Sequence, residues 1–296
     1  TSDTATMGGA GKADHQCFSY DGYRRLTNAW TPSTAGCSTE NRTVATLGGA
    51  APYWSTFSYN NAGLRTKEVT HATAGETTTT YTYGSTYTHR LSKTTTTKPD
   101  GTSTSASYTY DATGNTLTRP GVQGTQTLTW YAEGRMAANA EPAKGTAAAR
   151  NTSYVYDADG SLLIRRPTSG DGETVLYLGA TEVRMTVKSG VTTVSGRRTY
   201  SFNGMTIGVR TATSGTTGTK LTWLAGDRHG TASVMIDATT QAVTKRYSLP
   251  FGGPRGTKVT WVDDKGFLGK PMDAASALTH VGAREYDPKI GRFLSV

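Results

Sequence analysis

A short aromatic unit recurs along the chain, and no other sequence feature limits the possible folds as strongly. The unit is an aromatic residue, any residue, a second aromatic, Asp or Asn, and then a Gly a few positions later. Clear copies start at Tyr108 and Tyr154, where Asp111 and Asp157 follow the second aromatic. Looser or decayed copies start at Phe18, Phe57, Tyr81, Trp130 and Tyr200. Between Tyr83 and Tyr156 the copies lie about 20–27 residues apart, a period typical of stacked repeat arrays.

The unit predicts a β-hairpin. Side chains alternate along a strand, so the two aromatics lie on one face. The Asp can accept hydrogen bonds from backbone N–H groups ahead of it and start a turn, and the Gly takes the turn's sterically restricted last position. A single hairpin cannot bury its aromatic face, so we expect successive hairpins to pair edge to edge with their rings in ladders. We therefore predict an all-β array of antiparallel hairpins, which coils or curls because wide twisted sheets rarely stay open.

The composition favours the same fold class. Hydrophobic residues make up 35% of the chain and charged residues only 18%, while 35 glycines and 16 tyrosines are present. Tyr suits strands and Gly suits turns. No apolar run is long enough for a membrane-spanning helix. The net charge is +9, but Lys and Arg are scattered singly or in short pairs, so we expect no nucleic-acid partner.

Cys17 and Cys37 are the only cysteines. Their spacing fits no CxxC motif, and no paired zinc ligands lie near them in the sequence. We predict a disulfide, which would stabilise the fold by roughly 3 kcal/mol in the chain-entropy model; two free buried thiols are the alternative. A disulfide would favour an extracellular setting. The histidines are dispersed without paired-ligand spacing, so we expect no metal site and no cofactor.

An ordered series of motifs occupies the C-terminal part of the chain, from Asp227 to Ser295. Its residues are Asp227, Gly230, Pro250, Phe251, Gly252, Gly269, Arg284, Tyr286, Asp287, Pro288, Gly291, Arg292 and Phe293. The series resembles the Rhs repeat-associated core, and the Tyr-Asp units resemble the YD repeats of bacterial Rhs proteins, of Tc toxin C components and of animal teneurins. The stretch from Gln16 to Pro52 resembles the Cys-containing region of actinobacterial members.

This resemblance implies a long antiparallel β-sheet of YD-repeat hairpins that spirals into a hollow shell around a toxin or effector polypeptide. It implies a YD-repeat shell region at residues 1–220 and a core region at residues 221–296 that plugs one end. The implied partners are a C-terminal toxin cargo and the remaining shell of the same protein, and the implied localisation is secreted or cell-surface. In many relatives, aspartates in Asp-Pro motifs beyond the core cut the chain; the sequence stops at Val296, so we expect those aspartates outside it.

We expect no enzyme within these residues. Asp287 precedes Pro288 and is interpreted as a turn former, and the triplet Asp227–His229 before Gly230 is also interpreted as a turn. No Gly-x-Ser-x-Gly motif occurs. The main alternative to a structural shell is an adhesive or carbohydrate-binding surface, in which the many Tyr and Trp rings would lie exposed.

Overall fold

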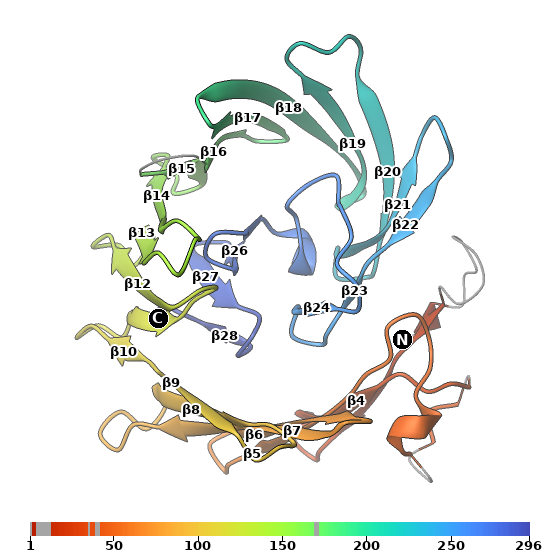
Figure 1. The fold of residues 1–296 in the computed structure, drawn as a ribbon, viewed down its shortest axis with the longest axis vertical. Coiled ribbons are helices and arrows are strands. Elements are labelled where there is room, and N and C mark those ends of the chain that lie inside the picture. The colour runs from red at the N-terminus through yellow and green to blue at the C-terminus, as the bar shows by residue number, and fades with distance from the viewer. Residues whose placement is uncertain (1, 4–12, 35, 39–41, 169–171) are drawn as a thin grey trace. The chain divides into compact units, whose positions relative to one another are not determined.

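Antiparallel β-strands make up almost all of the regular structure (Figure 1). The computed structural model describes residues 2–3, 13–34, 36–38, 42–168 and 172–296. Within these residues the only helices are two short 3-10 turns, η1 (Val44–Thr46) and η2 (Phe267–Gly269). The all-β prediction is confirmed. Across the same described residues, no helix has the length and hydrophobicity that crossing a membrane would require.

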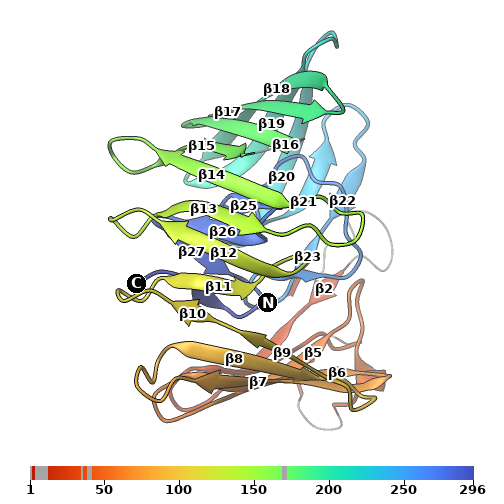
Figure 2. The same ribbon diagram turned by 60° about the vertical axis from the view of Figure 1, so that its left-hand side comes forward.

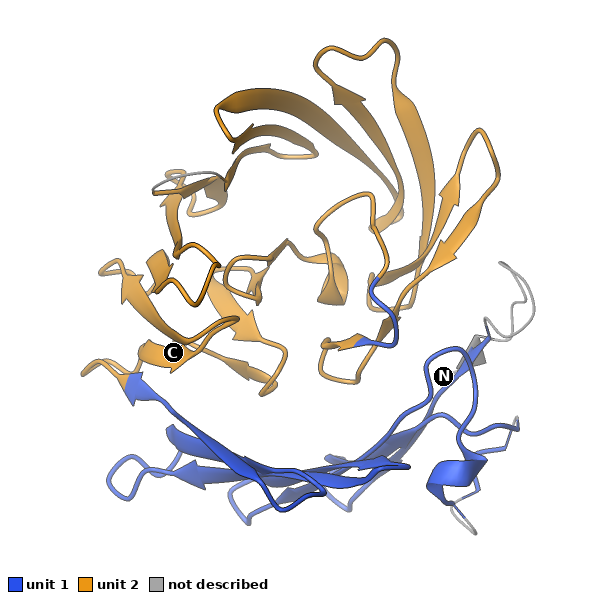
Figure 3. Cartoon of the chain, viewed as in Figure 1, with its two compact units in different colours: residues 1–109, 255–258 blue, residues 110–254, 259–296 orange. Residues whose placement is uncertain are grey.

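The chain divides into two compact units (Figure 3). Unit 1 comprises Thr1–Thr109 and Arg255–Lys258, and unit 2 comprises Tyr110–Pro254 and Val259–Val296. This division follows packing, whereas the predicted boundary between residues 220 and 221 separates two classes of sequence motif. That boundary stays a prediction.

Unit 1 contains a seven-stranded antiparallel sheet in which each strand pairs with the next one in sequence. Its strands are β3 (Cys17–Tyr20), β4 (Leu26–Trp30), β5 (Trp54–Tyr59), β6 (Arg65–Ala72), β7 (Gly75–Tyr83), β8 (Leu91–Thr97) and β9 (Ser103–Ser107). A separate short pair is formed by β1 (Ser2–Asp3) and β2 (Asp14–His15).

A 13-stranded antiparallel sheet, which we call the long sheet, forms most of unit 2 and again follows sequence order (Figure 2). Its strands are β10 (Thr109–Tyr110), β11 (Thr116–Pro120), β12 (Thr125–Trp130), β13 (Met136–Glu141), β14 (Arg150–Tyr156), β15 (Leu162–Pro167), β16 (Gly172–Leu178), β17 (Thr181–Lys188), β18 (Val191–Phe202), β19 (Met205–Thr213), β20 (Lys220–Gly226), β21 (Ala232–Asp237) and β22 (Val243–Lys245). The remaining strands are the pair β23 (Tyr247–Ser248) and β24 (Pro254–Arg255), and a four-stranded sheet of β25 (Met272–Asp273), β26 (Leu278–Val281), β27 (Arg284–Asp287) and β28 (Arg292–Phe293).

The Asp and the Gly of the repeat form the predicted turn. The Oδ1 atom of Asp111 accepts a hydrogen bond from the backbone N–H of Gly114 at 2.7 Å, and that of Asp157 accepts one from Ser161 at 2.7 Å. Gly114 and Gly160 have φ angles of +109° and +80°. Residues with a Cβ atom rarely adopt such angles, so the Gly is what allows the turn to close.

The second aromatic of the unit makes a bond that the sequence did not predict. The Tyr156 hydroxyl donates to the backbone carbonyl oxygen of Met136 at 3.0 Å. We call this a ring-to-carbonyl bond. Three more join Tyr59 to Leu26 at 2.8 Å, Tyr83 to Arg65 at 2.7 Å and the Trp130 indole N–H to Thr116 at 2.7 Å. Met136 pairs with Trp130 as Leu162 pairs with Tyr156, so Trp130 takes the place of the second aromatic, although the sequence pattern made it the first of its unit. A register shift lies beside each of these four rings, so a β-bulge accompanies each bond.

Arginine side chains lie over aromatic rings in unit 1. The Arg65 guanidinium is 5.7 Å from the ring centre of Phe57 and 4.6 Å from that of Tyr81, the first aromatics of successive units. Arg42 lies between the rings of Trp30 and Trp54 in the same way, at 4.4 and 4.6 Å. Cation–π contacts therefore join rings of different strands here, a contribution that the sequence did not predict.

Candidate functional site: the sheet face that holds the C-terminal segment

One face of the long sheet packs against residues 259–296, which we call the C-terminal segment. We call this the inward face of the sheet, and the opposite one the outward face. Two apolar clusters join sheet and segment. One consists of Leu128, Met136 and Tyr154 from the sheet with Leu278 and Leu294 from the segment. The other has Val209, Leu224 and Ala232 of the sheet at its centre. Met235, also from the sheet, and Trp261 and Val262 of the segment pack against them.

A buried ion pair connects the first strands of this sheet to the segment. Nε and Nη2 of Arg119, on β11, donate to Oδ2 of Asp287 at 3.1 and 2.8 Å, and the two side chains are 3% and 1% exposed. Nη1 of Arg119 also donates to Gln126 and to the carbonyl oxygen of Ser276. The backbone N–H of Lys289 donates to the other carboxylate oxygen of Asp287 at 2.9 Å. Asp287 therefore forms a turn, as expected, and also anchors the segment to the sheet.

A second ionic group lies on β17. Nη2 of Arg184 is 2.7 Å from Oδ2 of Asp264 in the segment and 2.8 Å from Glu182, and Nη1 is 2.6 Å from Glu173 on β16. Burial alone would lower the pKa of Arg184, but the carboxylates of Asp264 and Glu182 raise it well above its ordinary value. Arg184 is therefore held as a cation on the inward face.

Arg165, on β15, extends this group toward the rest of the segment. Its guanidinium lies 3.4 Å from Asp264 and 3.7 Å from Asp273. Burial opposes the charge, yet Asp273 and its other neighbours raise the pKa of Arg165. The Tyr154 hydroxyl donates to Asp273 at 2.7 Å, and burial raises the pKa of this phenol well above its usual value. Strands β14, β15 and β17 thus all bind aspartates of the segment.

Asp263, next to Asp264, has a different environment. Burial raises its pKa, and the one hydrogen bond described for its carboxylate comes from the backbone N–H of Lys265 at 3.1 Å. Burial also lowers the pKa of Arg246 to about 10, and this guanidinium lies 4.0 Å from the ring centre of Trp261. Arg246 also donates to the backbone carbonyl oxygens of Ala232 and Lys265, but no ion pair like that between Arg184 and Asp264 is described for Asp263 or Arg246.

The motif residues Asp227, Gly230 and Gly269 meet at one point. Oδ1 of Asp227 accepts hydrogen bonds from the backbone N–H groups of His229 and Thr231, at 2.8 and 3.0 Å. A Cβ atom on Gly269, where φ is +65°, would lie 2.8 Å from the carbonyl oxygen of Gly230. Glycine is therefore required for the segment to pass so close to this turn.

The motif aromatics form a second contact group within unit 2. The Tyr286 hydroxyl donates to the carbonyl oxygen of Phe251 at 2.9 Å. The Tyr286 ring lies 5.6 Å from that of Phe267 and 5.5 Å from that of Phe293, and Arg284 lies over Phe293 at 3.9 Å.

The remaining motif residues surround these rings or form turns. A Cβ atom on Gly252 would overlap the Phe267 ring, and one on Gly291 would lie 3.0 Å from the Phe251 ring. Arg292, on β28, pairs with Asp287 in register. Pro250 and Pro288 are half-buried in turns. Thus the predicted motif residues gather around the segment, where they act through packing and turns.

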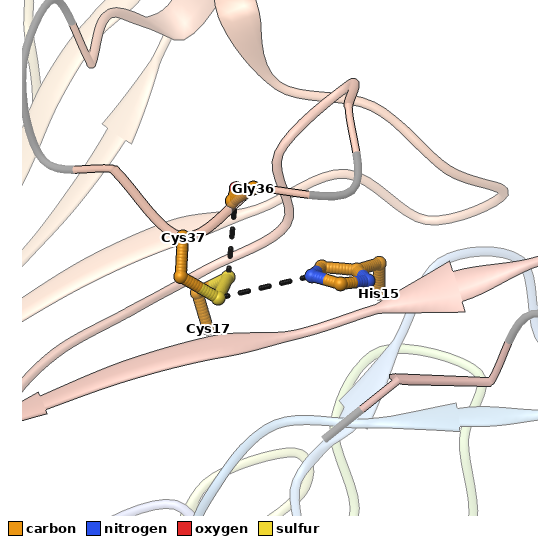
Figure 4. The surroundings of a disulfide bond; sticks show 4 residues. All are labelled: His15, Cys17, Gly36 and Cys37. Atoms are coloured by element: carbon orange, nitrogen blue, oxygen red, sulfur yellow. Dashed lines mark hydrogen bonds between the residues drawn. A yellow bond between two sulfur atoms is a disulfide. The ribbon is translucent and has the colours of Figure 1, made fainter.

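The structure joins Cys17 and Cys37 in a disulfide, with Cα atoms 5.5 Å apart (Figure 4). Nε2 of His15 lies 3.7 Å from the Cys37 sulfur, so the structure brings a histidine to this pair. The three side chains could approach one metal ion by distance. Metals bind thiolates, however, and sulfurs joined to each other are not thiolates.

Sequence analysis missed the residues of the sheet that bind the segment, namely Arg119, Arg165 and Arg184, and their partners Asp264 and Asp273. None of them belongs to a recognised motif. One usable signal existed, because Glu182 and Arg184 alternate with Val183 and Met185 along β17. That alternation marks a charged face, which pattern analysis alone would have assigned to solvent.

No protein-family model matches the sequence, and no curated protein matches it either. Among solved structures, the chain is similar to the crystal structures of TcdB2-TccC3 and of TcdB2-TccC3-Cdc42, each with a TM-score of 0.48 and 18% identity over 100% of this chain. It is also similar to a Photorhabdus luminescens Tc holotoxin pore that carries the TccC3-D651A mutation, with a TM-score of 0.48 and 18% identity over 96% of this chain and 17% of the other. The chain spans 18% of the length of the chains in the first two structures.

Proposed function

We propose that this chain is part of the structural shell of a secreted, Rhs-type polymorphic toxin, which encloses and presents a C-terminal toxin or effector polypeptide. The observation that carries this function is the buried attachment of the C-terminal segment across the inward face of the long sheet. A segment that plugs a shell must stay in place while the chain beyond it is enclosed. The pairs Arg119–Asp287 and Arg184–Asp264 are the kind of contact that resists displacement, since breaking a buried pair costs about 3–5 kcal/mol.

The alternative of an adhesive or carbohydrate-binding surface has less support. It depends on rings that are free to stack on a ligand. The first aromatics of four repeat units are instead buried, with 5% exposure at Phe57, 6% at Tyr81 and Tyr108, and 2% at Tyr154. Their burial favours a role in holding the hairpins together.

We further propose that these residues perform no reaction themselves. Asp287 is the aspartate of the motif series nearest the chain end, and both of its carboxylate oxygens already accept hydrogen bonds, from Arg119 and from Lys289. The test is incubation of the purified chain from mildly acidic to mildly basic pH with intact-mass measurement. A specific cut that disappears in Asp287→Asn would show that the chain is catalytic.

Enclosure itself is tested in the natural gene product that contains residues 1–296. We expect the polypeptide on the C-terminal side of Val296 to resist trypsin while the shell is folded, and to be digested once urea unfolds the shell. The matched reference is the same polypeptide expressed alone. Equal digestion rates in the folded protein and in the free polypeptide would contradict enclosure.

A further inference from the structure

One hairpin of the long sheet ends in an exposed, uncharged tip. The tip, Phe202–Met205, joins β18 to β19, and Phe202 is 75% exposed while Met205 is 42% exposed. Asn203 and Gly204 form the turn, with φ angles of +48° and +76°. Large apolar side chains at a free hairpin end contribute nothing to the core, which makes them candidates for contact with a partner.

Two amphipathic rings form the next row back from this tip. Tyr200 pairs with Gly208, and Gly208 pairs with Trp223, so the three residues lie side by side on one face of the sheet. Tyr200 is 40% exposed and Trp223 is 45% exposed. A Cβ atom on Gly208 would lie 3.4 Å from the Trp223 ring, so this ring extends over the glycine toward Tyr200.

Two arginines form the row behind the rings. Arg198 and Arg210 pair directly across β18 and β19, and both are exposed. Their neighbour Thr199 accepts a hydrogen bond from Lys265 of the C-terminal segment and so points inward. Because strand side chains alternate, Arg198 and Tyr200 point outward, away from the segment.

The charges of this row are not compensated within the described part of the chain. Each guanidinium donates to a threonine hydroxyl, Arg198 to Thr181 and Arg210 to Thr219, and no ion pair is described for either. By register, no Asp or Glu occupies an outward position of β17–β20. Like charges directly opposite each other on a sheet destabilise it, and an anionic partner would remove that cost.

We propose that this end of the long sheet docks onto an anionic phospholipid bilayer. The order of the rows matches the order of layers in a membrane: apolar tip, then Tyr and Trp, then arginines. Tyr and Trp favour the membrane interface, and arginines bind phosphate groups. Arg198 is four positions from Phe202, about 13 Å along a strand, so the tip enters the acyl region while the arginines meet the headgroups.

Other occupants fit less well. A second copy of this chain would bring two such arginine pairs together. An acidic protein would match the arginines, but it would not account for the rise in apolar exposure toward the free tip. Bilayer docking stands apart from the shell function, because it depends on the outward face alone.

The test is flotation of the purified chain with vesicles of phosphatidylcholine alone and of phosphatidylcholine with phosphatidylglycerol at about 3:1. We expect binding to the anionic vesicles that weakens with salt. Phe202→Asp and, as a second tip variant, Met205→Asp should each weaken it about tenfold or more, since the apolar contact is lost. Arg198→Gln combined with Arg210→Gln should weaken it about 30-fold, from roughly 1 kcal/mol for each arginine.

Matched controls come from unit 1. Tyr23→Asp alters a ring that is 84% exposed, and Lys98→Gln alters an exposed cation; both should bind like the parent chain. All variants are compared at equal folded fraction, measured by circular dichroism. Equal binding to neutral and anionic vesicles, or unchanged binding of the tip and arginine variants, would overturn the proposal. Binding to soluble poly-glutamate through the same arginines, without binding to vesicles, would also overturn the proposal, because the arginines would then serve an acidic polypeptide.

Discussion

The hydroxyl of Tyr156, on β14, donates a hydrogen bond to the backbone carbonyl oxygen of Met136, on β13. The bond joins two strands that belong to successive repeat units. Equivalent bonds start from Tyr59, Tyr83 and Trp130. In these four units the ring therefore has a polar role as well as an apolar one. Tyr and Trp suit this position because both rings carry a donor, whereas Phe202, the second aromatic of the unit that starts at Tyr200, has none.

Removing that donor should weaken the fold measurably. Tyr156→Phe keeps the ring and loses the bond, so we expect the free energy of unfolding to fall by about 1 kcal/mol. Urea denaturation followed by tyrosine and tryptophan fluorescence measures the change. Tyr23→Phe, at an exposed ring, is the control and should leave the midpoint unchanged. A midpoint in Tyr156→Phe equal to that of the parent chain would show that the bond adds no stability.

The pair Arg119–Asp287 should behave as a buried ion pair. Asp287→Ala leaves the Arg119 cation without its partner in a site where both side chains are almost fully buried. We expect a loss of about 3–5 kcal/mol in the free energy of unfolding. The double variant Arg119→Met with Asp287→Leu removes both charges and should recover most of that loss. If the double variant is as unstable as Asp287→Ala, the pair matters through shape and not through charge.

Adjacent aspartates should respond in opposite directions at neutral pH. Asp264→Asn removes the anion nearest Arg184 and should cost about 2–3 kcal/mol, because Glu182 and Glu173 still compensate that cation in part. Asp263 has a pKa raised by burial, so its ionisation opposes folding. Its contribution to stability is favourable at low pH and is lost as the pH rises from the ordinary carboxyl range through the raised pKa.

Asp263→Asn should therefore be as stable as the parent chain, or more stable, at pH 7. Thermal melts of both variants at pH 4 and pH 7 give the comparison. A large loss of stability at pH 7 in Asp263→Asn would show that the charge is compensated in solution.

The turn aspartate Asp111 should make stability depend on acid. Burial would raise its pKa, but hydrogen bonds from Thr113, Asn115 and Gly114 outweigh that effect and lower it to about 2. The stabilising effect is complete above the ordinary carboxyl pKa and is lost as the pH falls toward 2. The stability difference between the parent chain and Asp111→Ala should then shrink between pH 5 and pH 2. Asp111→Asn keeps an acceptor and should show a smaller difference at pH 7, as Asn60 fills the same position in another unit.

The fold was predictable because its determinants are local. The Asp and Gly of each unit specify the turn through backbone contacts within a few residues, as Asp111 and Gly114 do. The ring-to-carbonyl bond of Tyr156 was not predictable, because it depends on a β-bulge in the neighbouring strand and on a backbone atom that any residue supplies.

The attachment of the C-terminal segment was still harder to predict. Arg119 and Asp287 are 168 positions apart, and nothing local to either residue identifies the other. The motif series marked Asp287 for the turn that it forms, and its partner could be found only from the folded sheet. Pattern analysis treats alternating charges such as Glu182 and Arg184 as solvent-facing, while the segment buries them here.

The ring-to-carbonyl bonds have a consequence for how such a chain can change in length. Each bond links one hairpin only to the hairpin before it, so a duplicated or deleted hairpin would meet the same donor and the same acceptor at its new border. Gene rearrangements that add or remove whole units would thus preserve the join, whereas those that cut within a unit would separate a ring from its carbonyl. Natural variation in sheet length should then occur in steps of one hairpin.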